Sequence, residues 1–350
     1  MKPKSLFFLF FYPWLSFAQT NSSNNLDSIQ VTKIYDTKEY SAFTDLLRFN
    51  NAFYCSFRVG AKHAGYEDYG KVRIIKSLDG NNWESIAELN IKNLDLRDPK
   101  LSVTPDGRIM VIMAGARFNS DNLVNDLYPM VSFSNQRGED FEDPTKVVLD
   151  PNINPSKDWL WRVTWNNNVG YGINYQLKEN SRDWSKLDKD AWLLYLLKSN
   201  DGKSFESVSQ LDIDHLPNES TIRFDKNGTM YVLVRRESAG KLGVLAKSSY
   251  PYTNWSYTNL DFRLGGPNFL FLNDNNLVIG TRNYIKKAST SLLVTNLDGK
   301  VLKKIELPSG GDTSYPGMLV HDEKLWVSYY SNHEGNSSIY LAQVPLNKLK

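Results

Sequence analysis

The sequence is dominated by one repeated pattern, in which short apolar segments alternate with turns rich in Asp, Asn and Gly. Segments of this kind, bounded by such turns, are typical of β-strands joined in hairpins. No long stretch shows an apolar period of 3.6 residues, so we predict very little helix. Clear examples of the apolar segments are Val72–Ile75, Arg108–Ile112, Met230–Val234 and Leu325–Tyr329.

A turn motif recurs between these segments: a small polar residue, then an Asp or Asn with a Gly, and in most copies a closing aromatic residue. The Asp or Asn side chain can accept hydrogen bonds from the turn backbone, and Gly allows a positive φ. Copies begin at Ser77, Ser134 and Ser199, with weaker copies at Ser248 and Thr295. A spacing of roughly 45 to 65 residues is typical of a β-propeller, in which each blade is a four-stranded sheet. Five copies and a C-terminal set of strands predict an all-β, six-bladed propeller.

The composition excludes several classes of protein. One Cys and four His in 350 residues leave no disulfide framework and no Cys-rich zinc site, and we expect no metal or cofactor. A net charge of +2 gives no broad basic face for nucleic acid. The 13% of aromatic residues suits an all-β protein, and flat aromatic faces also suit sugar rings.

The N-terminus has the features of a secretory signal. A basic start precedes an apolar run that ends at Phe17-Ala18, which predicts a signal peptide over residues 1–18 and a flexible leader over 19–30. The apolar run is too short to span a membrane. We therefore expect a secreted or periplasmic protein with no membrane span, acting as a monomer, with a single propeller domain over residues 31–350.

Several motifs resemble those of the sialidase superfamily, which includes secreted bacterial proteins of the exo-sialidase-like type. The repeated turns look like its Asp-boxes, and Phe57-Arg58-Val59-Gly60 resembles the segment that carries its first arginine. Glu219 and Arg235 have the spacing of its Glu and second arginine, and Gly311–Tyr315 resembles the segment that carries its tyrosine. The resemblance covers about residues 50–345 and implies a six-bladed propeller of sialidase type.

The resemblance also implies roles for individual residues. Arg58, Arg235 and Arg282 would bind a substrate carboxylate, since a planar guanidinium pairs well with a carboxylate. Tyr315 would be the nucleophile and Glu219 its base, as in the sialidases, which differ from the usual two-carboxylate glycosidases. Asp68 would protonate the leaving oxygen. The implied activity is the retaining hydrolysis of a terminal acidic sugar, sialic acid or a uronic acid unit, from a glycan or polysaccharide.

Other polar residues precede or follow predicted strands and could line the central funnel of a propeller. We expect Arg97, Asp98, Arg162 and His63 to contribute to substrate binding there. The segment Arg97-Asp98-Pro99 also resembles the repeat that carries a sialidase arginine, so that either Arg58 or Arg97 could be the first arginine of the site.

Three alternatives stay open at this point. Arg97-Asp98-Pro99 also resembles a segment of five-bladed furanosidases, but their N-terminal Asn-Asp-Pro segment is absent. A polysaccharide lyase would use His63 or a tyrosine as base, with arginines neutralising a uronate carboxylate. A propeller that binds glycan or protein without turnover would need none of this chemistry.

Overall fold

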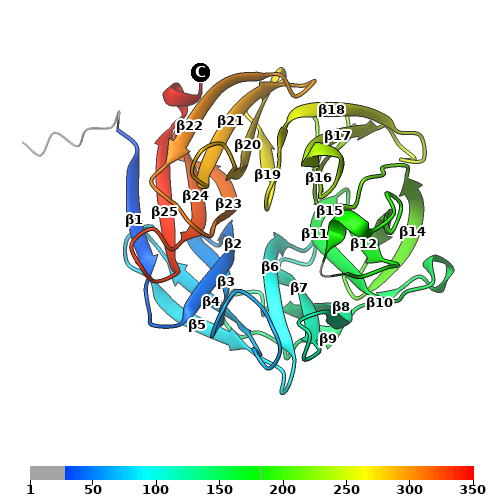
Figure 1. Ribbon diagram of the computed structural model, residues 1–350. Coiled ribbons are helices and arrows are strands. Elements are labelled where there is room, and N and C mark those ends of the chain that lie inside the picture. Colours follow the sequence, from blue (N-terminus) through cyan, green and yellow to red (C-terminus); the bar gives the residue numbers. More distant parts are fainter. Residues whose placement is uncertain (1–27, 182) are drawn as a thin grey trace, which may run out of the picture.

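The computed structural model describes residues 28–181 and 183–350, so the predicted signal peptide and most of the predicted leader lie outside the described residues. Six sheets, antiparallel apart from one short edge strand, are arranged around a central axis, as Figure 1 shows. The predicted all-β, six-bladed propeller is confirmed. The predicted scarcity of helix is confirmed as well, since the described helices are short 3-10 segments: η1 (Pro151–Ile153), η2 (Trp184–Lys186), η3 (Ala239–Lys241) and η4 (Leu346–Leu349).

Each blade begins with an inner strand at the axis and continues outward in chain order. Blade 1 contains β2 (Tyr40–Phe49), β3 (Ala52–Gly60), β4 (Lys71–Ser77) and β5 (Glu84–Leu89). Blade 2 contains β6 (Asp95–Val103), β7 (Ile109–Phe118), β8 (Val124–Phe133) and β9 (Thr145–Lys146). Blade 3 contains β11 (Asp158–Asn166), β12 (Val169–Leu177), β13 (Trp192–Ser199) and β14 (Ser204–Leu211), and β10 (Val148–Leu149) pairs in parallel with β14.

The second half of the ring follows the same plan, except for its last blade. Blade 4 contains β15 (Pro217–Phe224), β16 (Met230–Arg236), β17 (Leu242–Ser248) and β18 (Ser256–Arg263). Blade 5 contains β19 (Asn268–Phe271), β20 (Asn276–Asn283), β21 (Ser289–Asn296) and β22 (Val301–Leu307). Blade 6 contains β23 (Thr313–His321), β24 (Lys324–Ser331) and β25 (Ser338–Pro345), and its outer strand is β1 (Gln30–Tyr35) from the N-terminus. Gln30, which the sequence analysis placed at the end of the predicted leader, is the first residue of β1.

The repeated turns join the third and fourth strands of their blades. In the first copy, Ser77 Oγ accepts from the Gly80 N–H at 2.8 Å, and Asp79 Oδ1 accepts from two further backbone N–H groups. The copy at Ser199 has the same three bonds within 0.1 Å. The turn glycine has a positive φ of 75° at Gly80 and would place a Cβ atom against Trp326 of the preceding blade. The motif therefore closes a hairpin and also seals one blade against the next.

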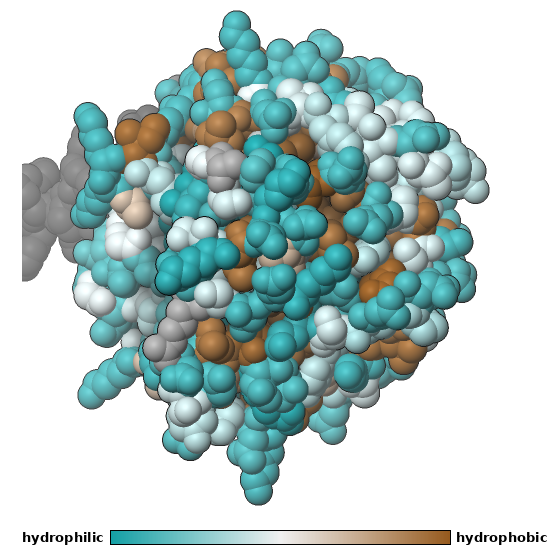
Figure 2. Space-filling view, turned by 45° about the vertical axis from the view of Figure 1, so that its right-hand side comes forward, coloured by the Kyte–Doolittle hydropathy of each residue, from teal (hydrophilic) through white to brown (hydrophobic). Residues whose placement is uncertain are grey.

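Apolar side chains fill the space between neighbouring blades. One buried cluster joins Tyr54, Val72 and Ile74 of blade 1 to Leu96 and Val111 of blade 2. Because each sheet is covered on both faces, its strands are apolar on both sides rather than strictly alternating. The face in Figure 2 is mostly hydrophilic, with hydrophobic residues in small separate patches. Within the described residues, no helix has the length and apolar character needed to cross a membrane.

Candidate active site

The inner strands of five blades carry a bulge at equivalent positions. In each of β2, β6, β11, β15 and β23, one extra residue interrupts the pairing with the next strand. A bulge redirects side chains and is common beside active sites. The bulged residues are Phe43–Thr44, Asp98–Pro99, Trp161–Arg162, Asn218–Glu219 and Tyr315–Pro316. The bulges therefore explain why side chains from distant parts of the sequence gather in one place.

Tyr315, Glu219 and Arg235 form the centre of the candidate site. The Tyr315 hydroxyl donates to Glu219 Oε1 at 2.5 Å. Arg235 Nη1 donates to Glu219 Oε2 at 2.7 Å and to the Tyr315 hydroxyl oxygen at 3.0 Å. The backbone N–H of Gly266 also donates to Glu219 Oε2, at 2.9 Å. Blade 4 thus supplies a carboxylate and a guanidinium, and blade 6 supplies a phenol, in mutual contact.

The electrostatics of this group fix its resting protonation states. Burial raises the pKa of the Tyr315 phenol well above its ordinary value, and the neighbouring Glu219 carboxylate adds to this. Burial alone would raise the pKa of Glu219, but Arg235 and the hydrogen bond from Tyr315 lower it overall. Glu219 is therefore a carboxylate and Tyr315 a neutral phenol, which are the states required of a base beside a nucleophile.

Aromatic rings and a buried lysine surround Tyr315. The Tyr315 ring lies 5.0 Å from the Phe43 ring and 5.9 Å from the Trp161 ring, measured between centroids. Lys100 Nζ lies 4.8 Å from the centroid of Trp161 and 5.9 Å from that of Tyr315. Burial lowers the pKa of Lys100 to about 8, and burial raises that of nearby Asp98. These contacts fix the Tyr315 ring and place further ionisable groups beneath it.

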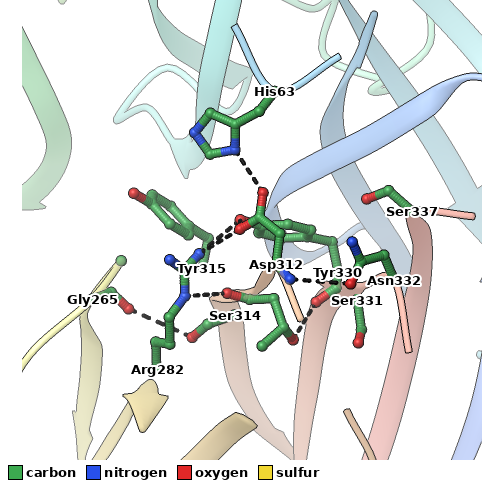
Figure 3. A network of polar contacts seen from close by, with 12 residues as sticks. His63, Gly265, Arg282, Asp312, Ser314, Tyr315, Tyr330, Ser331, Asn332 and Ser337 are labelled. Carbon is green, nitrogen blue, oxygen red and sulfur yellow. Dashed lines mark hydrogen bonds and ion pairs between the residues drawn. The ribbon is translucent and has the colours of Figure 1, made fainter. Parts of the chain in front are cut away.

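Arg282 connects Tyr315 to a network at the more exposed side of the site. Its guanidinium carbon lies 5.8 Å from the Tyr315 ring centroid, and its Nη2 donates to Asp312 Oδ1 and to the Tyr330 hydroxyl, both at 2.9 Å. Asp312 in turn contacts His63, with 2.6 Å between Oδ2 and Nδ1. Figure 3 shows Arg282, Asp312 and His63 in this order beside the Tyr315 ring.

Arg97 lies at the site, but its donors are already engaged. Its three nitrogen atoms donate to Asp98, Asp95 and the backbone oxygen of His63. Its guanidinium carbon is 5.0 Å from the Phe43 ring centroid. Of the two arginines considered for the first position, Arg97 is the one beside Phe43, whose ring contacts the Tyr315 ring. Arg97 thus adds positive charge and packing to the wall of the site.

Arg58 and Asp68, predicted as substrate-binding and proton-donating residues, lie together in a buried ion-pair cluster with Asp95. Arg58 is fully buried, and its guanidinium donates to Asp95, to Asp68 and to the Lys62 backbone oxygen at 2.7 to 3.0 Å. A ligand has no access to it. Burial alone would raise the pKa of Asp68, but Arg58 and two backbone N–H groups lower it overall.

Arg162 also lies outside the group around Tyr315. Its Nη1 and Nη2 atoms pair with the two carboxylate oxygens of Asp45 at 2.7 and 3.0 Å. It lines a separate cavity with Arg223 and with later residues of the inner strands, including Leu101 and Leu319. Trp161 contacts the Tyr315 ring, whereas the guanidinium of the next residue, Arg162, is held by Asp45.

Sequence reasoning missed several residues of the site. Asp312 lies only three positions before Tyr315, within the segment that resembles the sialidase tyrosine region. Gly266 stands before Pro267, as Asp98 stands before Pro99, and proline in a sheet is confined to edges, strand starts and bulges. An X-Pro pair at the start of an inner strand was thus a usable signal. No comparable signal marks Phe43, Trp161, Lys100, Tyr40 or Tyr330.

No group of three or more His, Cys, Asp or Glu side chains within residues 28–181 and 183–350 is arranged to hold a metal ion.

Gly266 offers a test of how tightly Tyr315 is held. It has a φ of +60°, and a Cβ atom there would lie 2.5 Å from the Tyr315 ring. We expect Gly266→Ala to lower the free energy of unfolding by about 1–3 kcal/mol more than Gly228→Ala does, because the Tyr315 ring must move to make room for the new Cβ atom. Urea denaturation measures this. Gly228→Ala is the matched control, since Gly228 has a φ of +79° and open space around it. Equal losses would show that Tyr315 moves freely.

The comparisons with known proteins support the fold. No family model matches the sequence, and no curated protein matches it. Among solved structures, a protein of unknown function from Dyadobacter fermentans has a TM-score of 0.75 at 19% identity, over 90% of this chain and 98% of its own. Trypanosoma rangeli sialidase with the inhibitor DANA has a TM-score of 0.68 at 9% identity, over 90% of this chain and 59% of its own. A phage phi92 endosialidase has a TM-score of 0.65 at 13% identity, over 91% of this chain and 69% of its own.

These matches show that the chain has the propeller fold found in sialidases. The chain spans about three fifths of the length of the Trypanosoma rangeli enzyme.

Proposed function

We propose that this protein is a retaining glycoside hydrolase that removes a terminal acidic sugar from a glycan or polysaccharide. The observation that carries the proposal is the contact between Tyr315 and Glu219, with Arg235 bonded to both. A phenol hydrogen-bonded to a carboxylate is an activated nucleophile when the carboxylate can take its proton. The propeller fold shared with sialidases is consistent with this chemistry, although fold alone does not assign it.

The first half of the reaction forms a bond between the Tyr315 oxygen and the anomeric carbon. As that bond forms, the phenolic proton passes to Glu219 and the bond to the leaving oxygen breaks. A neutral phenol approaches a sugar that carries a carboxylate with less charge repulsion than a second carboxylate would. Water then bonds to the anomeric carbon as the bond between that carbon and the Tyr315 oxygen breaks, and Tyr315 recovers its proton from Glu219. Two inversions at one carbon give net retention.

Positive charge near Tyr315 favours an anionic sugar. Arg235 contacts the Tyr315 oxygen directly, and Arg282 lies over the Tyr315 ring and is the more exposed of the two. Both also face carboxylates of the protein, Glu237 and Asp312 respectively. A substrate carboxylate would therefore share these guanidiniums with the protein rather than meet them unpaired.

Trapping the covalent intermediate tests the proposal. We would incubate the protein with 2,3-difluorosialic acid and with 2-fluoro uronosyl fluorides, then digest it and map the modified peptide by mass spectrometry. The expected result is a single sugar adduct on Tyr315, together with release of the retained anomer from an active aryl glycoside, seen by proton NMR. An adduct on another residue, or an unsaturated uronate product, would overturn the proposal, and the latter would indicate a lyase. Binding of acidic sugars with no turnover would indicate a glycan-binding propeller.

A further inference from the structure

The hydrolysis proposed above needs a proton donor for the leaving oxygen, and Asp68 does not supply it. Both Asp68 oxygens are engaged, with Arg58 Nη2 at 3.0 Å and the N–H groups of Ala61 and Lys62 at 2.8 and 3.1 Å. The donor must also be reachable from the mouth of the site, because the leaving group extends toward solvent. Asp98 has a pKa raised by burial, but it is almost fully buried and accepts a bond from Arg97.

His63 meets these requirements. Its side chain is 49% exposed, whereas Tyr315 and Glu219 are buried below it. The Phe43 ring lies 5.0 Å from the His63 ring and 5.0 Å from the Tyr315 ring, so a single phenyl group separates the two. In Figure 3 the second ring nitrogen of His63 is turned away from Asp312, on the side of the Tyr315 ring.

Asp312 holds His63 in one orientation. Its Oδ2 lies 2.6 Å from His63 Nδ1 and also accepts a short hydrogen bond from Tyr40. Its Oδ1 accepts from the Tyr330 hydroxyl at 2.7 Å and from Arg282. Burial alone would raise the pKa of Asp312, but His63 and Arg282 lower it overall, so it stays a carboxylate. A carboxylate on Nδ1 fixes the tautomer and leaves Nε2 as the position that exchanges a proton.

Arg58 and Asp68 have a role in this arrangement. His63 lies in the loop between β3 and β4, and Arg58 Nη1 donates to the Lys62 backbone oxygen at 2.7 Å. Asp68 accepts from the N–H groups of Ala61 and Lys62, and Arg97 Nη2 donates to the His63 backbone oxygen at 3.3 Å. These buried side chains therefore tie down the loop that presents His63.

We propose that His63, oriented by Asp312, is the general acid and base of this site, an inference that rests on the proposed hydrolase function. In the first step His63 Nε2 gives its proton to the leaving oxygen as the glycosidic bond breaks and the Tyr315 oxygen bonds to the anomeric carbon. In the second step the neutral imidazole takes a proton from water as the water oxygen bonds to the anomeric carbon and the Tyr315 oxygen leaves. His63 thereby ends each cycle protonated, as it began.

The test compares leaving groups. We would measure kcat/KM of wild type, His63→Gln and Asp312→Asn on phenyl and 4-nitrophenyl glycosides of N-acetylneuraminic acid and glucuronic acid. We expect His63→Gln to lose about 10²-fold or more on phenyl glycosides, whose leaving group needs a proton, and much less on 4-nitrophenyl glycosides. Asp312→Asn should show the same leaving-group dependence to a smaller degree.

The controls separate this inference from the proposed function. His321→Gln removes another histidine that lies beside a carboxylate, with 3.0 Å between His321 Nε2 and Asp322 Oδ2. His321 is at the far end of β23, so this variant should leave kcat/KM unchanged. If wild type is active and Tyr315→Phe is inactive, but His63→Gln loses equally on both leaving groups, the function stands and the role of His63 is refuted. A leaving-group dependence in Asp98→Asn instead of His63→Gln would assign the proton to Asp98. An inactive wild type on all four glycosides would refute both proposals.

Discussion

Replacing Tyr315 with phenylalanine is expected to lower kcat/KM by at least about 10³-fold while the folded structure is kept. The variant retains the ring that packs against Phe43 and Trp161 and loses only the oxygen that would bond to the sugar. Glu219 keeps its bonds to Arg235 and Gly266, so its charge stays compensated. Steady-state kinetics on an active aryl glycoside measure the loss, and calorimetry should show that the free sugar still binds.

A second tyrosine provides the matched control for this experiment. Tyr329 is fully buried, and its hydroxyl donates to the Pro308 backbone oxygen at 2.8 Å, outside the candidate site. Tyr329→Phe therefore removes one buried hydrogen bond, which costs about 1 kcal/mol of stability, and should leave turnover unchanged. A Tyr315→Phe variant that turns over substrate as fast as Tyr329→Phe would exclude Tyr315 as the nucleophile.

Replacing Asp95 with alanine is expected to lower the free energy of unfolding by about 3–5 kcal/mol. Asp95 Oδ1 accepts from Arg58 Nε at 2.7 Å and from the Gly70 N–H at 3.1 Å, and Oδ2 lies 3.5 Å from Arg97 Nη1. Removing Asp95 leaves the fully buried guanidinium of Arg58 with Asp68 as its only carboxylate partner. Urea denaturation with circular dichroism measures the change, and the loop that carries His63 should exchange its amide hydrogens faster.

An exposed ion pair gives the comparison for Asp95. Arg117 Nη1 lies 3.2 Å from Asp126 Oδ2, and both side chains are about two-fifths exposed. Asp126→Ala should cost less than about 1 kcal/mol, because exposed pairs are solvated and screened. The Arg58 cluster also predicts acid sensitivity. Because the pKa of Asp68 is lower in the folded protein than its ordinary value of 3.8, its ionisation stabilises the fold at pH values above 3.8. This contribution is lost as the pH falls through the pKa of Asp68 in the folded protein. Similar losses for the two alanine variants would show that burial of the cluster has little effect.

The architecture could be predicted from the sequence because its signals are local. A Ser-x-Asp-Gly turn forms the same three hydrogen bonds at Ser77 and Ser199, so each copy predicts a hairpin from its own residues alone. The pairing of Glu219 with Arg235 was also accessible, since β15 and β16 are consecutive strands joined by a short turn. Tyr315 was named only through the resemblance of Gly311–Tyr315 to the sialidase tyrosine segment, and the closed ring brings its hydroxyl to Glu219.

The roles of the other arginines could not be predicted in the same way. The partner that holds each guanidinium comes from another blade, and this partner decides whether the arginine is free to bind a ligand. The partners are Asp95 of blade 2 for Arg58, Asp45 of blade 1 for Arg162 and Asp312 of blade 6 for Arg282. The bulges add a second difficulty, because one extra residue reverses which side of a strand the following side chains face. A spacing in the sequence therefore identified polar residues near the axis but not which of them are open to a ligand.

The use of the N-terminal strand β1 as the outer strand of blade 6 has a consequence for how the protein reaches its final state. Val31 pairs with Ala342 and Thr32 with Leu341, so the circle is closed by residues from opposite ends of the polypeptide. Bringing such distant segments together carries a large entropic cost that is recovered only when the whole circle has assembled. Blade 6, which carries Tyr315 and Asp312, is therefore complete only once β1 has paired with β25.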